Sequence, residues 1–214
     1  MLKVWGRRNS LNVQKVLWFV GELGLPYEHI PAGGDFGRLE DSDFRALNPH
    51  GLVPVVQDGG ATVWESHAIL RYLAEAHGDG RFWPDLAQRS VIEPWMDWAQ
   101  TQFQPSFSAG LFWGYFRTPA DRRDWPAIRE HVAECDRQLS VLDAVLADRR
   151  FVAGDQFTLA VVPIGACMFR YFNLDLPRTP LPNVERWREA LEARPAYREH
   201  VMLPFDDLRG RLAF

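Results

Sequence analysis

A hydroxyl and two carboxamides stand close together where Asn9, Ser10 and Asn12 follow a short apolar strand at 2–4. The apolar spacing after them predicts a helix over 11–23. Free backbone N–H groups and the helix dipole favour an anion at such an N-terminus. Ser10 or Asn9 could equally cap the helix. Because no cysteine stands at this turn, sulfur chemistry here would need a thiolate supplied by a ligand.

Val53 and Pro54 interrupt an apparent strand at 52–57. Proline lacks the N–H that a strand donates, so it belongs at a sheet edge or after a cis peptide bond. A cis bond would leave the backbone N–H and C=O of Val53 free to pair with an extended peptide. The alternative is an edge-strand proline that binds nothing.

Glu65 and Ser66 stand where a hairpin meets a helix predicted over 66–77. Ser66 is expected at the N-cap, where its hydroxyl and backbone N–H could bind a carboxylate, while Glu65 could accept from an ammonium. Together they would suit an α-amino acid head group, although a serine cap usually binds no ligand. Arg38 and His50 could meet a second carboxylate or simply be solvated.

Strands and helices alternate in the first 77 residues, and the rest of the chain is helical in pattern. The strands are expected at 2–4, 27–30, 52–57 and 61–64. The helices of this part are expected at 11–23, 43–47 and 66–77. Later helices are expected at 90–116, 127–146, 158–172, 182–192 and 196–202. Glycines and a proline at 78–84 indicate a linker. We therefore expect an α/β domain at 1–78, with a small mixed sheet, and an all-helical domain at 88–214.

The composition is that of a globular protein, with 47% apolar and 24% charged residues in 214. A net charge of −4 argues against nucleic acid or an anionic membrane as partner. No apolar segment is long enough to span a bilayer, and the N-terminus lacks the apolar core of a signal peptide. Cys135 and Cys167 are expected as reduced, buried thiols of a cytoplasmic protein. The six histidines show no metal-ligand spacing, so no metal site is expected.

These groups outline one ligand with an α-amino acid end, a peptide centre, a second carboxylate and a thiol, which is glutathione. At this point the sequence resembles the cytosolic glutathione S-transferases over essentially its whole length. The motifs that carry the resemblance are NSLNVQKV at 9–16, NPHGLVPV at 48–55, WESHAI at 64–69 and FVAGDQFTLA at 151–160. It is most similar to the bacterial serine-using branch, theta-like or beta-like.

The resemblance implies an α/β thioredoxin-like N-terminal domain, an all-α C-terminal domain and a homodimer. It implies glutathione as co-substrate and no permanently bound cofactor. Ser10 would donate a hydrogen bond to the glutathione sulfur, with Asn12 and Asn9 as further donor candidates whose order stays open. The expected glutathione contacts are Asn9, Arg38, His50, Val53, Pro54, Glu65 and Ser66.

A pocket for a small electrophile is expected between the domains, and the high aromatic content favours an apolar one. Its candidate residues are Trp5, Arg7, Phe107, Trp113 and Phe116. Arg7 and Arg8 could steer an anionic co-substrate or be solvated. The same thiolate would serve conjugation, isomerisation, dehalogenation or reduction. A non-catalytic glutathione-binding or protein-interaction module of this fold is the other alternative.

Val161 departs from the family pattern, which has an acidic residue there. Thr158 is expected to cap the helix at 158–172, but the reciprocal bond of a capping box is lost.

Overall fold

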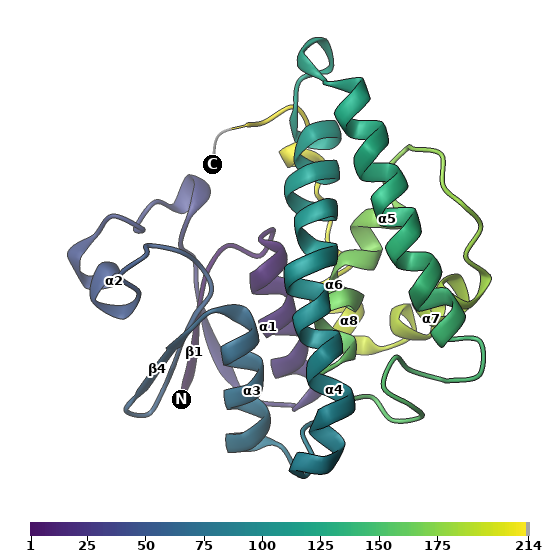
Figure 1. The fold of residues 1–214 in the computed structure, drawn as a ribbon. Helices are drawn as coiled ribbons and strands as arrows, with labels where there is room; N and C mark the ends of the chain where they lie inside the picture. The colour runs from purple at the N-terminus through teal and green to yellow at the C-terminus, as the bar shows by residue number, and fades with distance from the viewer. Residues whose placement is uncertain (213–214) are drawn as a thin grey trace.

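The computed structural model of the chain describes residues 1–212 and combines a small sheet and its helices with a larger helical part (Figure 1). Four strands lie in the order β2-β1-β3-β4. Strands β1 and β2 are parallel, whereas β3 runs antiparallel to both β1 and β4. The strands are β1 (Leu2–Trp5), β2 (Tyr27–Ile30), β3 (Val55–Asp58) and β4 (Ala61–Trp64). The mixed sheet is confirmed, while the domain boundaries 1–78 and 88–214 stay predictions.

Strand β3 begins later than the sequence indicates. The Val53–Pro54 peptide bond is cis, and pairing with β1 starts at Val55. Proline has no N–H to donate, so the ladder begins only after it. The alternative of an edge-strand proline is wrong, because β3 lies between β1 and β4 and Pro54 precedes it.

Three helices belong to the sheet and the others form the second part. The first group is α1 (Leu11–Glu22), α2 (Ser42–Leu47) and α3 (Ser66–His77), with a 3-10 turn η1 (Gly34–Phe36). The second group is α4 (Leu86–Trp98), η2 (Ala99–Phe103), η3 (Pro105–Arg117), η4 (Ala120–Arg122), α5 (Trp125–Val145), α6 (Val161–Phe172), α7 (Pro182–Glu192), α8 (Pro195–His200) and η5 (Asp206–Leu208). Each predicted helix is present, with some ends shifted and one helix divided.

The predicted helix at 90–116 is a rod of α4, η2 and η3, and its last two segments are π-helical. At its end the N–H of Thr118 donates to the carbonyl of Trp113, five residues back, at 3.0 Å. Pro94 and Pro105 lie within the rod and each lacks a backbone donor. A π-helix holds more residues per turn than an α-helix, so different side chains share a face.

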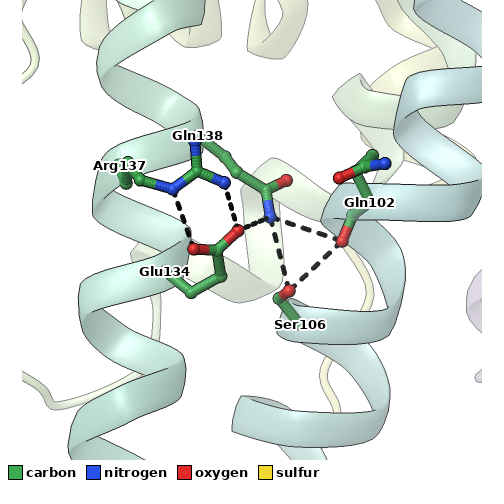
Figure 2. A network of polar contacts seen from close by, with 5 residues as sticks. All are labelled: Gln102, Ser106, Glu134, Arg137 and Gln138. Atoms are coloured by element: carbon green, nitrogen blue, oxygen red, sulfur yellow. Dashed lines mark hydrogen bonds and ion pairs between the residues drawn. The ribbon is translucent and has the colours of Figure 1, made fainter.

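Gln138 of α5 ties the rod to its neighbour at the point where η2 meets η3 (Figure 2). Its amide nitrogen lies 2.5 Å from a Glu134 oxygen, 3.4 Å from the hydroxyl of Ser106 and 3.5 Å from the carbonyl of Gln102. Glu134 is also held by two bonds from Arg137. The buried Gln138 therefore fixes both sides of position 104, which lies at the candidate site.

Helix α6 begins at Val161 with Ala160 as its N-cap, so the expected capping by Thr158 is wrong. The Thr158 carbonyl accepts from Val161 N–H at 3.1 Å, and its buried hydroxyl has no hydrogen-bond partner within residues 1–212. A tight turn at 158–160 thus replaces the first helical turn.

Helix α1 joins the two parts, lying between α3 on one side and α6 and α8 on the other (Figure 1). All its residues from 13 to 20 are buried. The Trp18 ring meets Tyr197 edge-on with ring centres 4.8 Å apart and Phe157 at 5.6 Å. One continuous apolar core therefore spans both parts of the molecule.

Gly165 of α6 allows this close approach. A Cβ there would lie 2.8 Å from the Trp18 ring and 3.0 Å from Leu191, both buried. We expect Gly165→Ala to lower the free energy of unfolding by about 1–3 kcal/mol, because a rigid indole must move. Gly114→Ala is the control, since its nearest side-chain neighbour is Ile128 at 3.8 Å. Urea unfolding measures both, and equal midpoints would contradict the packing argument.

Candidate functional site

Ser10 occupies the N-cap of α1 with extended backbone angles (φ −84°, ψ 126°), yet its side chain makes no capping hydrogen bond. The hydroxyl therefore does not satisfy its own helix. It lies instead beside a cavity of about 140 Å³ at the junction of the two parts. The cavity is lined by Arg7, Asn9, Ser10, Leu11, Asn12, Gln104, Ser108, Phe112, Trp113, Arg117, Arg170 and Leu208.

Both neighbouring asparagines point to partners in the helical part. The Asn9 amide donates to Asp207 at 2.7 Å, and the Asn9 carbonyl accepts from Arg170 at 2.8 Å. The Asn12 side-chain oxygen accepts from Gln104 at 3.1 Å. Among the three predicted sulfur donors, Ser10 is thus the one whose side chain is not engaged across the junction.

Lys15 lies one turn further along α1 and is 1% exposed. Its ammonium is 2.5 Å from Gln104 Oε1 and 3.3 Å from His67 Nε2. Burial lowers the pKa of Lys15 to about 8. Burial, and then the charges of Lys15 and Arg71, lower the pKa of His67 to about 2. His67 is therefore neutral, and its Nε2 accepts from the ammonium. This chain of contacts holds Gln104, which in turn holds Asn12.

The expectation that Ser66 is the N-cap of the helix is wrong by one residue. Glu65 is the N-cap of α3, with φ 68° and no side-chain cap, and the buried Ser66 is the first helical residue. A positive φ at a non-glycine residue is unfavourable and is typical of positions held for a purpose. The exposed Glu65 carboxylate and the Ser66 backbone thus remain adjacent at a helix start, as a head-group site needs.

Arg38 and His50 are exposed and lie in loops that flank α2. The His50 ring meets Trp64 edge-on at 5.3 Å, and the Arg38 guanidinium lies 5.8 Å from the centre of the Trp5 ring. Asn48 stabilises the loop before Val53, donating to the Leu52 carbonyl and accepting from the His50 N–H.

Two of the five predicted pocket residues, Arg7 and Trp113, line the cavity, and Trp5, Phe107 and Phe116 do not. The Trp5 N–H donates to Gln57 at 2.9 Å on the sheet. Phe107 and Phe116 are buried in stacks with other phenylalanines, with ring centres 5.7 and 5.2 Å apart. The rings of Phe107 and Phe116 thus lie in the core and Trp5 lies on the sheet, while the assignment of the five residues to a co-substrate pocket stays a prediction.

Seven residues that line the cavity were not predicted from the sequence: Leu11, Gln104, Ser108, Phe112, Arg117, Arg170 and Leu208. Gln104, Ser108 and Phe112 recur every four residues, a spacing that could have marked a common face. Nothing in the sequence connects Arg170 with this turn, 161 residues away.

Cys135 and Cys167 are buried free thiols. Burial raises their pKa values to about 12 and about 11, so both stay protonated at neutral pH. Within residues 1–212, no group of three potential metal ligands gathers and no helix is long and apolar enough to cross a membrane.

A small mixed sheet whose first helix is enclosed by an all-helical domain has the architecture of the cytosolic glutathione transferases. The family model for the glutathione S-transferase N-terminal domain matches residues 1–75, and that for the C-terminal domain matches 103–195. The chain belongs to the glutathione S-transferase family.

Individual relatives agree along nearly the whole chain. Glutathione S-transferase GstB of Escherichia coli is 45% identical over 95% of this chain and 99% of its own. Glutathione S-transferase 3 of Zea mays is 32% identical, covering 94% and 93%. The glutathione-bound theta class enzyme of Xanthomonas axonopodis pv. citri superposes with a TM-score of 0.90 at 38% identity, covering 95% and 98%. The expected similarity to a bacterial theta-like branch is thereby supported.

The buried Lys15 generates a pH-dependent prediction. Its folded pKa lies below its ordinary value of 10.5, so between about pH 8 and 10.5 the unfolded chain binds more protons. The free energy of unfolding of the wild type, relative to Lys15→Met, should therefore rise with pH across this window, by on the order of 3 kcal/mol. Chemical denaturation at several pH values measures it. Lys3→Met, at a half-exposed position on β1, is the control. A difference that does not change with pH would refute the prediction.

Proposed function

We propose that this chain is a glutathione transferase in which Ser10 holds the glutathione sulfur as a thiolate. The observation that carries the proposal is the Ser10 hydroxyl at a helix N-terminus, without a capping bond and beside a cavity between the two domains. A thiol has an ordinary pKa of about 8.5. Lowering it by about 2 units takes roughly 2.7 kcal/mol, which one charge-assisted hydrogen bond and the helix dipole can supply.

Glutathione is proposed to lie along the sheet side of the junction. Its α-amino acid end would meet the Glu65 carboxylate and the N–H of Ser66, and its central peptide would pair with the backbone of Val53 beside Pro54. His50 and Arg38 would meet the remaining carboxylate. What supports this order is that α3 contacts β3, β4 and α1, and that Val53 and Val13 of α1 both lie against Gly6 in the loop after β1.

The reaction needs only that the thiolate attack a small electrophile in the cavity, with the leaving group departing with its bonding electron pair. No permanently bound cofactor is required for this step. Reduced glutathione is abundant inside cells, so a cytoplasmic location is proposed. The buried, protonated Cys135 and Cys167 suit that setting. A homodimer is proposed on the family resemblance.

Ser10→Ala should lower the thiolate fraction of bound glutathione and reduce kcat about 10- to 100-fold, because one hydrogen bond to a charged acceptor is lost. Binding of glutathione should change less than about threefold. Ultraviolet thiolate absorbance of the complex, titrated against pH, measures the effect. Ser42→Ala, at an exposed position starting α2, is the control. If the titration is unchanged, Asn12 or backbone N–H groups stabilise the thiolate and Ser10 does not.

Glu65→Gln should weaken glutathione binding about 10- to 100-fold with little change in the pKa of the bound thiol, since it removes the charge opposite the ammonium. A glutathione analogue lacking the amino group should bind wild type and variant equally well. Calorimetry with both ligands tests this. Equal weakening for the two ligands would show that Glu65 contributes only backbone geometry.

A further inference from the structure

The cavity beside Ser10 gathers three arginines from three separate elements. Arg7 comes from the loop between β1 and α1, Arg117 from the end of η3 and Arg170 from α6. All three line the same space as the Ser10 hydroxyl. The sequence left open whether Arg7 and Arg8 could steer an anion. Arg8 is exposed and lies outside this cavity, although it lines a neighbouring cavity together with Arg7.

The two arginines from the helical domain are almost entirely buried, with Arg117 1% and Arg170 4% exposed. The Arg117 guanidinium stacks 3.8 Å from the centre of the Trp113 ring and donates to the Arg211 carbonyl at 2.8 Å. Arg170 donates to the Asn9 carbonyl and to Gln14. Its buried Nε has no hydrogen-bond partner within residues 1–212. These hydrogen bonds and the ring contact hold the two side chains in place at the cavity wall.

The arginines are close enough to repel one another. Burial lowers the pKa of Arg117 and of Arg170 to about 10, and the positive charge of Arg7 contributes to both. The carboxylate of Asp207 opposes this shift at all three arginines. Like charges brought together in a buried cleft destabilise the fold and are typical of functional sites.

Of the contacts expected for glutathione, Asn9 lines this cavity, beside the candidate sulfur donors Ser10 and Asn12. Glu65, Val53, His50 and Arg38 do not line this cavity. The cavity is therefore the space on the other side of the sulfur, where the co-substrate enters. Its volume of about 140 Å³ is close to that of a cavity that holds a single benzene ring, so the ring of a small co-substrate fits in it. Phe112 and Trp113 supply the apolar part of its wall.

Resting on the proposed transferase function, we propose that the co-substrate is a small electrophile that carries a carboxylate, bound by Arg7, Arg117 and Arg170. A carboxylate accepts two parallel N–H bonds from a guanidinium, which fixes its orientation as well as its place. The electrophilic carbon then faces the sulfur at Ser10. This class differs from the apolar co-substrate that the aromatic content favours, because the rings of Phe107 and Phe116 are in the core.

Two chloronitroarenes that differ in one charge test the proposal: 4-chloro-3-nitrobenzoate and 4-chloro-3-nitrobenzamide. In each, the glutathione sulfur bonds to the ring carbon that carries chlorine, and chloride leaves with the electron pair of the broken bond. The kcat/KM for each, divided by its uncatalysed rate with glutathione, gives the enzyme's own preference. We expect the wild type to favour the benzoate by about 10- to 100-fold, the value of a charge-assisted hydrogen bond.

Arg117→Met should reduce that preference about tenfold by acting on the benzoate alone. Arg129→Met, which removes the same charge at an exposed position of α5, should change it less than about twofold. Equal losses for both substrates would mean that the arginines act on the sulfur or on charge developing in the ring, and would overturn the proposal. A wild-type preference near one would overturn it as well.

If Arg117→Met does not fold, the inhibition of the wild-type enzyme by two simple aromatic compounds tests the proposal instead. Benzoate should then inhibit conjugation competitively with the electrophile at least about tenfold better than benzamide. Equal inhibition would refute the carboxylate site. Failure of the transferase proposal itself has a different signature: neither chloroarene is conjugated, and glutathione does not bind in calorimetry.

Discussion

The burial of α1 on every side is the constraint on which the rest of the structure depends. Helix α3 holds it from one direction and α6 and α8 from the other, so both domains fix the same helix. Its N-terminus therefore cannot move relative to either domain without opening the common core. Ser10 and the cavity beside it take their positions from this packing, and the site exists only where the two domains meet.

Enclosing α1 also brings charge into the interior. Lys15 has no route to solvent, and its ammonium is stabilised by Gln104 and His67 instead of water. Arg170 enters from the opposite side and donates to the carbonyl of Asn9. Buried cations of this kind are tolerated only when hydrogen bonds replace their hydration. The polar chain from His67 through Lys15 and Gln104 to Asn12 thereby links α3, α1 and the helical rod.

The helical rod of α4, η2 and η3 determines which side chains line the cavity. Phe107 and Phe116 were candidates for a pocket wall as aromatic residues of the helix, but in η3 both side chains are buried in the core. The same turns bring Gln104, Ser108, Phe112 and Arg117 to the cavity. Gln138 holds the junction of η2 and η3 in position through contacts to Gln102 and Ser106. An aromatic-rich sequence thus produces a cavity rich in arginine.

The sequence alone determined what depends on neighbours along the chain. The strand and helix on either side of Ser10 and the helix that starts beside Glu65 were predicted, and the cis bond before Pro54 was one of two alternatives, because hydrophobic spacing and backbone chemistry are local. The tertiary structure decided what depends on residues far apart in sequence. Arg170 reaches Asn9 across 161 positions, and Lys15 reaches Gln104 across 89. Side-chain direction in the rod follows from cooperative packing against α5 and α6, which no local pattern encodes.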